Sequence, residues 1–271
     1  MPDIETRFPE LADHRTTATR LRPRRGEPGV RDSSVGGPLL WPTDEAWPVC
    51  QNRHETLLAH VREHGFPKPS SVDGDALRLL ADGGPVPLVP VAQLFRRDVP
   101  DFFGPVGTDL AQVLWCPLDH SYWSPEVTVF WRTAADVGNV LADPPRPRVF
   151  NENYLPAACV VSPEQVIEHE WVELLPEPLQ TRFEDDDLYD EYDAISVAGG
   201  WKVGGFTAWG LTGPYDVTCD CGEPMRMLLA ATSAEPGRGG HPTAVTIGSG
   251  HTLSAWVCPA DFTHPVQTSR Q

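Results

Sequence analysis

Short runs in which apolar and polar residues alternate dominate this chain, and they predict strands. The clearest alternation covers residues 126–131 (E-V-T-V-F-W), and residues 109–115 follow a similar pattern. Residues 86–94 and 227–231 are short apolar runs, typical of central strands. Residues 243–247 and 252–256 flank Gly248-Ser249-Gly250, which predicts a hairpin. A further strand is expected over residues 165–175.

Helical periodicity is confined to residues 55–63 and, more weakly, residues 74–80. Both stretches follow Cys50 and precede the apolar run near Pro87. A helical insertion is therefore expected near residues 52–82.

Three features occur twice in the same order, which indicates an internal duplication. Both V-G-G-x-x-x-W segments are followed by a cysteine, and each half closes on a W-C-P or W-V-C-P segment with a histidine beyond it. The repeated features are Val35-Gly36-Gly37 with Trp41 and Val203-Gly204-Gly205 with Trp209, then Cys50 and Cys219, then Trp115-Cys116-Pro117 and Trp256-Val257-Cys258-Pro259. Paired glycines suit a tight turn or bulge that leads into a strand, because glycine tolerates positive φ.

The fold class expected from these patterns is mainly β (α+β), with two pseudo-repeated antiparallel halves and a short helical insertion in the first. We place an N-terminal segment at 1–27, the first half at 28–180, an acidic connector at 181–195 and the compact second half at 196–271. Together they would form one compact unit. The connector contains a run of carboxylates that predicts a solvated segment. Twenty-nine prolines among 271 residues fit a chain rich in loops and strand ends.

A net charge of −17 argues against nucleic acid and anionic membrane surfaces as partners, and it allows a basic protein partner. The basic cluster from Arg20 to Arg25 is expected to be a solvated part of the N-terminal segment. We find no apolar stretch of membrane-spanning length and no secretory signal, so a cytoplasmic location is expected. The six cysteines should then be thiols or metal ligands.

The second half holds the stronger candidate metal site, which consists of Cys219, Cys221, Cys258 and His264. Three thiolates and an imidazole form a standard structural zinc set. The C-x-C spacing is tighter than the usual knuckle, and buried thiols beside a surface histidine are the alternative. The first half offers a weaker candidate in two C-x3-H pairs, Cys50 with His54 and Cys116 with His120.

Other chemical patterns are expected to be incidental. Glu168 and Glu170 would share the solvent face of a strand. The run Asp119-His120-Ser121 contains triad residue types, but sequential neighbours rarely assemble a triad. His60 and His64 share a helix face and are expected to be solvated. We assign no catalytic or organic cofactor residues.

The chain resembles the YwqG-like family of bacterial proteins. The similarity is carried by residues 32–42 (D-S-S-V-G-G-P-L-L-W-P), Trp47-Pro48-Val49-Cys50, residues 112–117, residues 200–205 and Cys219-Asp220-Cys221-Gly222. The resemblance implies two related, mostly antiparallel β halves and no established activity. Immunity or chaperone-like binding roles are suspected for some members of the family. Relatives tend to carry C-x-x-C pairs where this chain has C-x-C and the lone Cys258.

These features favour a non-catalytic protein-binding protein of immunity or chaperone type, with zinc as a structural stabiliser. The specific form we favour is an acidic immunity protein that neutralises a basic nuclease toxin. One alternative is a metal-dependent hydrolase that uses the first-half cluster around an open zinc position. The other is a structural accessory protein. The sequence leaves the oligomeric state open.

Overall fold

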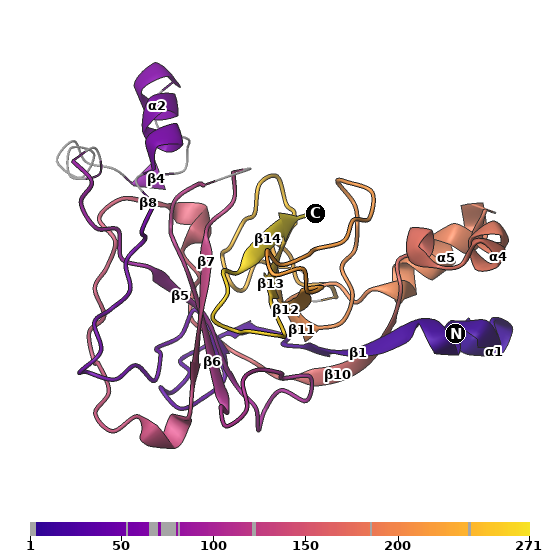
Figure 1. The fold of residues 1–271 in the computed structure, drawn as a ribbon, viewed down its shortest axis with the longest axis horizontal. Coiled ribbons are helices and arrows are strands. Elements are labelled where there is room, and N and C mark those ends of the chain that lie inside the picture. Colours follow the sequence, from indigo (N-terminus) through magenta and orange to yellow (C-terminus); the bar gives the residue numbers. More distant parts are fainter. Residues whose placement is uncertain are drawn as a thin grey trace.

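A computed structural model describes residues 4–52, 54–64, 70–71, 80, 82–120, 123–184, 186–237 and 240–271 of the chain. Its main elements are two six-stranded sheets in which every pairing is antiparallel (Figure 1). The first sheet has the order β2-β9-β3-β5-β6-β7, and the second has the order β10-β1-β11-β12-β13-β14. The predicted mainly β fold with few helices is therefore confirmed.

Four consecutive positions in each sheet correspond. The order β3-β5-β6-β7 in the first sheet matches the order β11-β12-β13-β14 in the second. The first set is β3 (Ser34–Val35), β5 (Val89–Phe95), β6 (Leu110–Trp115) and β7 (Val127–Arg132). The second set is β11 (Lys202–Gly204), β12 (Arg226–Thr232), β13 (Thr252–Val257) and β14 (Gln267–Arg270). The repeat expected from the sequence motifs is thus present in the strand topology.

The correspondence extends to single residues. The ladder between β5 and β6 shifts register between Pro90 and Ala92, and the ladder between β12 and β13 shifts at the matching place, between Met227 and Leu229. Gly36 and Gly204 follow the matching valines of β3 and β11 and have φ of 62° and 69°, as expected for glycines that turn the chain. A Cβ on Gly36 would lie 2.7 Å from the Ala157 carbonyl oxygen, so this position also requires glycine for space.

A two-stranded ribbon joins the halves. One side consists of β1 (Arg15–Arg20) in the second sheet and β2 (Arg24–Arg25) in the first, and the other side consists of β9 (Cys159–Val160) in the first sheet and β10 (Glu164–His169) in the second. The pairs β1–β10 and β2–β9 are both antiparallel, and β1 also pairs with β11. The residues assigned to an N-terminal segment therefore supply an interior strand of the second sheet.

The helices lie outside the sheets. The predicted insertion helix is confirmed as α2 (Glu55–His64), which stands away from the sheets at the top of Figure 1, whereas most of the second helical stretch, residues 74–80, lies outside the described residues. A small lobe beyond the ends of β1 and β10 contains the short helices α1 (Ile4–Arg7) and η1 (Pro9–His14), then η5 (Val172–Leu174), α4 (Glu177–Gln180), η6 (Thr181–Phe183) and α5 (Asp186–Ser196). The acidic connector is mostly α5, whose Tyr192 packs into the apolar core of this lobe.

Two strand predictions are corrected. Residues 243–247 do not form a strand, since only Ile247 makes an isolated bridge, to His251; β13 pairs with β12 and β14 instead. The strand expected over residues 165–175 is β10, which ends at His169 because a 3₁₀ turn follows at Val172. Smaller elements complete the fold: β4 (Ser70–Ser71) pairs with β8 (Phe150–Asn151), and η3 (Ala134–Asp136) and η4 (Glu152–Tyr154) are single turns.

The main core lies between the two sheets. Val91, Val113, Leu228 and Ala255 contribute to one buried cluster that includes residues of both repeats. A second cluster contains Trp41, Leu114 and Cys116 at the α2 end of the first sheet. The two halves therefore share a core, and the burial of apolar surface stabilises them together.

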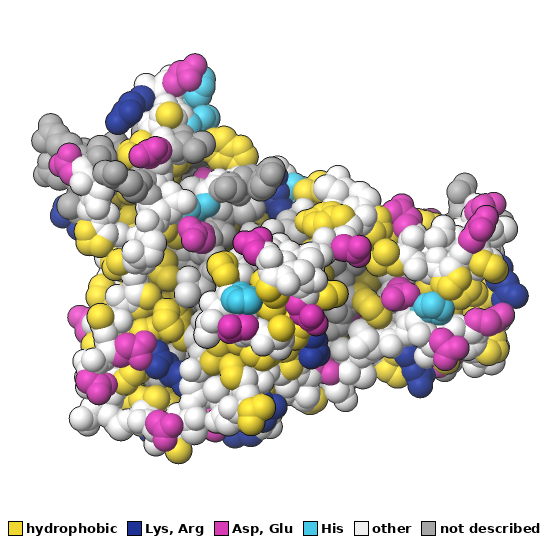
Figure 2. Space-filling view, viewed as in Figure 1, with side chains coloured by type: hydrophobic (Ala, Val, Ile, Leu, Met, Phe, Trp, Pro, Cys, Tyr) yellow, Lys and Arg dark blue, Asp and Glu magenta, His cyan; other side chains and the backbone are white. Residues whose placement is uncertain are grey.

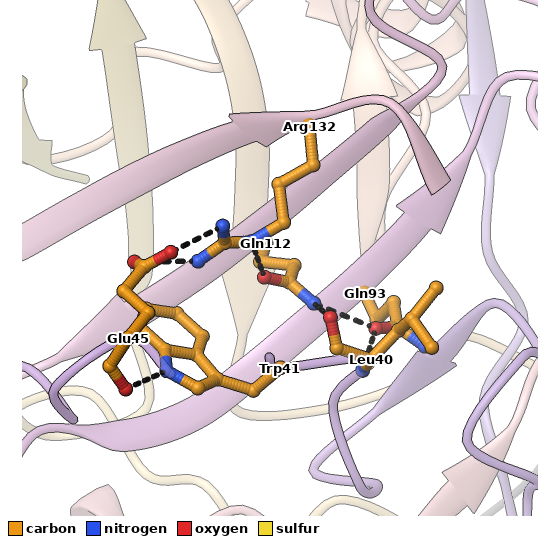
Figure 3. A network of polar contacts seen from close by, with 6 residues as sticks. All are labelled: Leu40, Trp41, Glu45, Gln93, Gln112 and Arg132. Atoms are coloured by element: carbon orange, nitrogen blue, oxygen red, sulfur yellow. Dashed lines mark hydrogen bonds and ion pairs between the residues drawn. The ribbon is translucent and has the colours of Figure 1, made fainter. Parts of the chain in front are cut away.

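A buried polar network holds the segment that leads to Cys50 (Figure 3). Gln93 of β5 accepts a hydrogen bond from the Leu40 N–H at 2.7 Å, and Gln112 of β6 donates to the Leu40 carbonyl at 3.0 Å. Arg132 of β7 forms a bidentate pair with Glu45, and its guanidinium lies 4.3 Å over the Trp41 ring. Gln93 and Gln112 are completely buried, and buried polar groups that are hydrogen-bonded favour a single arrangement of the segment.

No helix within the described ranges combines the length and apolar character that crossing a membrane requires.

Candidate metal centres

Each repeat brings a cysteine to the same place by the same backbone contacts. Val49 and Pro87 form an isolated antiparallel bridge before β5, and Thr218 and Pro224 form the equivalent bridge before β12. The next residues in each turn, Cys50 and Cys219, donate their N–H groups to the carbonyls of Val86 and Glu223 at 2.8 and 2.9 Å. These two cysteines are therefore positioned as structural equivalents.

A second pair of equivalent cysteines, Cys116 and Cys258, follows the third strand of each repeat. Cys116 comes directly after β6, and Cys258 comes directly after β13. Both side chains are completely buried. Because β5 pairs with β6, Cys50 and Cys116 meet at one end of the first sheet. Because β12 pairs with β13, Cys219 and Cys258 meet at the equivalent end of the second sheet.

The turn between the paired positions differs sharply between the halves. In the second half only Asp220, Cys221 and Gly222 separate Cys219 from Glu223, and Gly222 has a φ of 91°. In the first half the same turn carries the α2 insertion, and His54 immediately precedes that helix. The insertion therefore lies in the turn that carries the candidate ligands. His54 in the first half takes the place that Cys221 has in the second half.

In the second centre the four predicted residues converge. The donor atoms of Cys219, Cys221, Cys258 and His264 all lie within 4.8 Å of one another. The Cys219 sulfur is 3.3 Å from His264 Nδ1, and the Cys221 sulfur is 3.7 Å from the Cys258 sulfur. The tight C-x-C spacing is therefore compatible with a common site.

The weaker prediction also converges. The donor atoms of Cys50, His54, Cys116 and His120 lie within the same 4.8 Å limit. The His54 Nε2 atom is 3.2 Å from the Cys116 sulfur, the Cys50 sulfur is 3.7 Å from His120 Nε2, and the two imidazole rings are 4.8 Å apart. His54 has a φ of 54°, so the chain adopts an unusual backbone conformation to place this side chain.

These separations fit one tetrahedral ion. Zinc–sulfur and zinc–nitrogen bonds of about 2.3 and 2.05 Å at tetrahedral angles place ligand atoms roughly 3.5–3.8 Å apart. Four of the donor–donor separations lie between 3.2 and 3.7 Å, close to this range, and all donor atoms of each cluster lie within 4.8 Å of one another. Both clusters can therefore bind a metal ion, with four protein donors each.

The thiols of each centre differ in acidity. A hydrogen bond from Cys116 and smaller ones from His120 and His54 lower the pKa of Cys50 well below its usual range, whereas burial raises the pKa of Cys116. In the second centre burial acts to raise the pKa of Cys258, but hydrogen bonds from the Asp261 backbone and from His264 lower it to about 7. Each cluster thus stabilises a thiolate, which is the form of cysteine that binds metal.

A carboxylate lies behind the histidine of each centre, and neither carboxylate is predicted from the sequence. Glu126 Oε2 is 3.2 Å from His120 Nδ1, and Asp261 Oδ2 is 3.6 Å from His264 Nε2. In each case the other ring nitrogen faces a cysteine sulfur. This carboxylate–histidine arrangement is the usual support of a metal-bound imidazole. Cys116 donates its N–H to the Glu126 carbonyl at 2.9 Å, just beyond the paired ends of β6 and β7, so the position of Glu126 depends on the fold; Asp261 lies only three residues before His264.

Glu126→Gln should weaken metal binding at the first centre by about 10–100-fold, because supporting carboxylates orient the imidazole and raise its basicity. Competition with a chromophoric chelator would measure the change. The matched variant Asp261→Asn should weaken only the second centre. Equal metal affinity of Glu126→Gln and the parent protein would contradict a metal-supporting role for Glu126.

Three further candidates, Glu168, Asp119 and Cys159, belong to neither Cys/His cluster. Glu168, expected on a solvent face, is completely buried and forms an ion pair of 2.5 Å with Lys202, so that expectation was wrong. Asp119 accepts a hydrogen bond from the Tyr154 hydroxyl at 2.6 Å, and Ser121 lies outside the described residues. Cys159 is buried and belongs to neither cluster.

Neither the models of known protein families nor the curated proteins give a match to this chain.

Proposed function

We propose that this protein is a non-catalytic, protein-binding scaffold of the YwqG-like kind, stabilised by two structural zinc ions. The observation that carries the proposal is the pair of four-donor Cys/His clusters at equivalent positions of the two repeats. Thiolate and imidazole donors in a closed tetrahedral set are typical of structural zinc sites.

The first centre bears on the alternative of a metal-dependent hydrolase. A catalytic zinc ion requires a coordination position that is open to water or substrate. Cys50, His54, Cys116 and His120 would together occupy all four tetrahedral positions. The donor set therefore supports a structural ion at this centre as well.

The charge and the sheet edges support a binding role. The chain has 38 acidic and 21 basic residues, which favours a basic partner through electrostatic attraction. Among the described residues, each sheet ends in strands that pair on one side only: β2 and β7 in the first sheet, β10 and β14 in the second. Such edges are the places where a partner strand can add to a sheet. An immunity protein that neutralises a basic toxin is the specific form of this proposal.

Elemental analysis of the purified protein tests the proposal, with two zinc ions per chain as the expected result. The zinc-loaded protein should show no turnover of ester, phosphoester or peptide substrates. Hydrolysis that disappears in His120→Ala while the second zinc remains bound would support the hydrolase instead. For the binding role, a basic partner should associate in a salt-sensitive manner, and one that binds equally well in high salt would contradict the electrostatic part.

A further inference from the structure

Two imidazoles lie one turn apart on the protruding helix α2. His60 and His64 occupy positions i and i+4, which face the same side of a helix. Their ring centroids are 4.8 Å apart, and 56% of the His64 side chain is exposed. Histidine side chains gather at this end of the molecule, beside an acidic group (Figure 2).

The surroundings of the pair add a carboxylate and an indole. Glu63 Oε2 is 3.6 Å from His64 Nε2. The Trp123 ring meets His60 edge to face, with a centroid distance of 5.0 Å, and Trp123 is 45% exposed. Trp123 therefore covers one flank of His60, while His64 stays open to solvent.

We propose that His60 and His64 form a surface site for a divalent late transition-metal ion, separate from the two Cys/His centres. Imidazole is a preferred ligand of Zn²⁺, Cu²⁺ and Ni²⁺, and two imidazoles on one helix face can bind the same ion. The neighbouring Glu63 carboxylate and the net charge of −17 attract a cation to this site. Water would complete the coordination, so the ion would exchange readily.

This site differs from the first centre, although α2 connects the two. His54 packs against His120 and contacts the Cys116 sulfur. His60 lies six residues further along the chain, which corresponds to roughly 9 Å of helix. The two sites therefore share no ligand, and the outer one contains no thiolate.

Titration of the as-purified protein with Ni²⁺, followed by tryptophan fluorescence, tests this proposal. Trp123 should be quenched as the site fills, because it touches His60. We expect saturable quenching that is lost in Trp123→Phe, whereas Ni²⁺ uptake of that variant in equilibrium dialysis stays unchanged. His60→Gln and His64→Gln should each weaken Ni²⁺ binding at least about tenfold, since loss of a supporting group alone can have that effect.

His241→Gln is the matched control, because His241 is exposed and lies in a loop outside α2; this variant should bind Ni²⁺ like the parent. The metal content of the protein, measured before and after titration, distinguishes Ni²⁺ binding at α2 from displacement of an ion at the Cys/His centres. If His60→Gln disturbs the helix, the Ni²⁺ affinity of His64→Gln tests the proposal instead, because His64 is exposed and its replacement should leave the helix intact. Unchanged Ni²⁺ affinity in His64→Gln, or an absence of saturable quenching in the parent, would overturn the proposal.

Discussion

With the two proposed zinc ions in place, replacing Cys258 by serine should reduce the bound zinc from two ions per chain to one and destabilise the protein strongly. Cys258 is completely buried and contributes one of three thiolates to the second centre. A serine hydroxyl of similar size stays protonated and is a poor zinc ligand. An ion present at a thousand times its dissociation constant contributes about 4 kcal/mol to the free energy of unfolding. A loss of this size corresponds to a fall in Tm of roughly 8–16 °C.

Cys159→Ser is the control for this experiment. Cys159 is equally buried but lies outside both clusters, and its thiol donates to the Pro242 carbonyl at 3.2 Å. A hydroxyl can keep that hydrogen bond, so this variant should retain two zinc ions. Elemental analysis and thermal unfolding with and without a chelator give the comparison. Two zinc ions in Cys258→Ser, or the same zinc loss in Cys159→Ser, would contradict the assignment of the second centre.

Replacing Lys202, whose ammonium group forms the buried ion pair with Glu168, should also lower the stability of the protein strongly. The Glu168 carboxylate also accepts hydrogen bonds from the N–H groups of Ala198 and Phe206 at 2.9 and 2.7 Å. Lys202→Met would leave this carboxylate buried without its cation. Removal of one partner of a buried pair costs about 3–5 kcal/mol, because the remaining charge is uncompensated.

Urea denaturation measures this loss as a lower midpoint of unfolding. Arg7→Met is the matched control, because Arg7 pairs with Glu191 at a partly exposed position where 38% of the arginine side chain is accessible. That variant should lose less than about 1 kcal/mol. A similar decrease in the free energy of unfolding in the two variants would show that burial does not increase the contribution of the Lys202–Glu168 pair to stability.

The sequence predicts the parts of this fold that have a local or repeated signature. The V-G-G and W-C-P motifs identify the repeat, and it appears in matching strand orders and matching bulges. The periodicity of residues 55–63 predicts α2. The cysteine and histidine spacings identify both clusters, since each ligand pair lies within one short segment. The C-x-C spacing is tighter than the usual knuckle, and the sequence does not show how tightly the chain turns at Gly222, which has a φ of 91°.

Features that depend on distant pairing leave no such signature. The alternation around Glu168 predicts a solvent face, but Lys202 reaches it from β11, which lies beyond β1 in the sheet. Glu126 supports His120 only because β7 pairs with β6. In the same way, the short run from Arg15 to Arg20 has no obvious partner until β10 and β11 are both in place.

The ribbon that joins the sheets also makes the completion of the second sheet depend on segments that are far apart in the chain. Ala18 in β1 pairs with Val166 on one side and with Gly204 on the other. Both contacts close very long loops, which is slow because chain entropy opposes long-range pairing. During synthesis β1 precedes both of its partners: one side stays unpaired until β10 has left the ribosome, and the other side until β11 has followed. The first repeat, by contrast, can pair β5 with β6 and β6 with β7 much earlier. The N-terminal strand is thus among the last to be locked, and its pairing completes the second sheet.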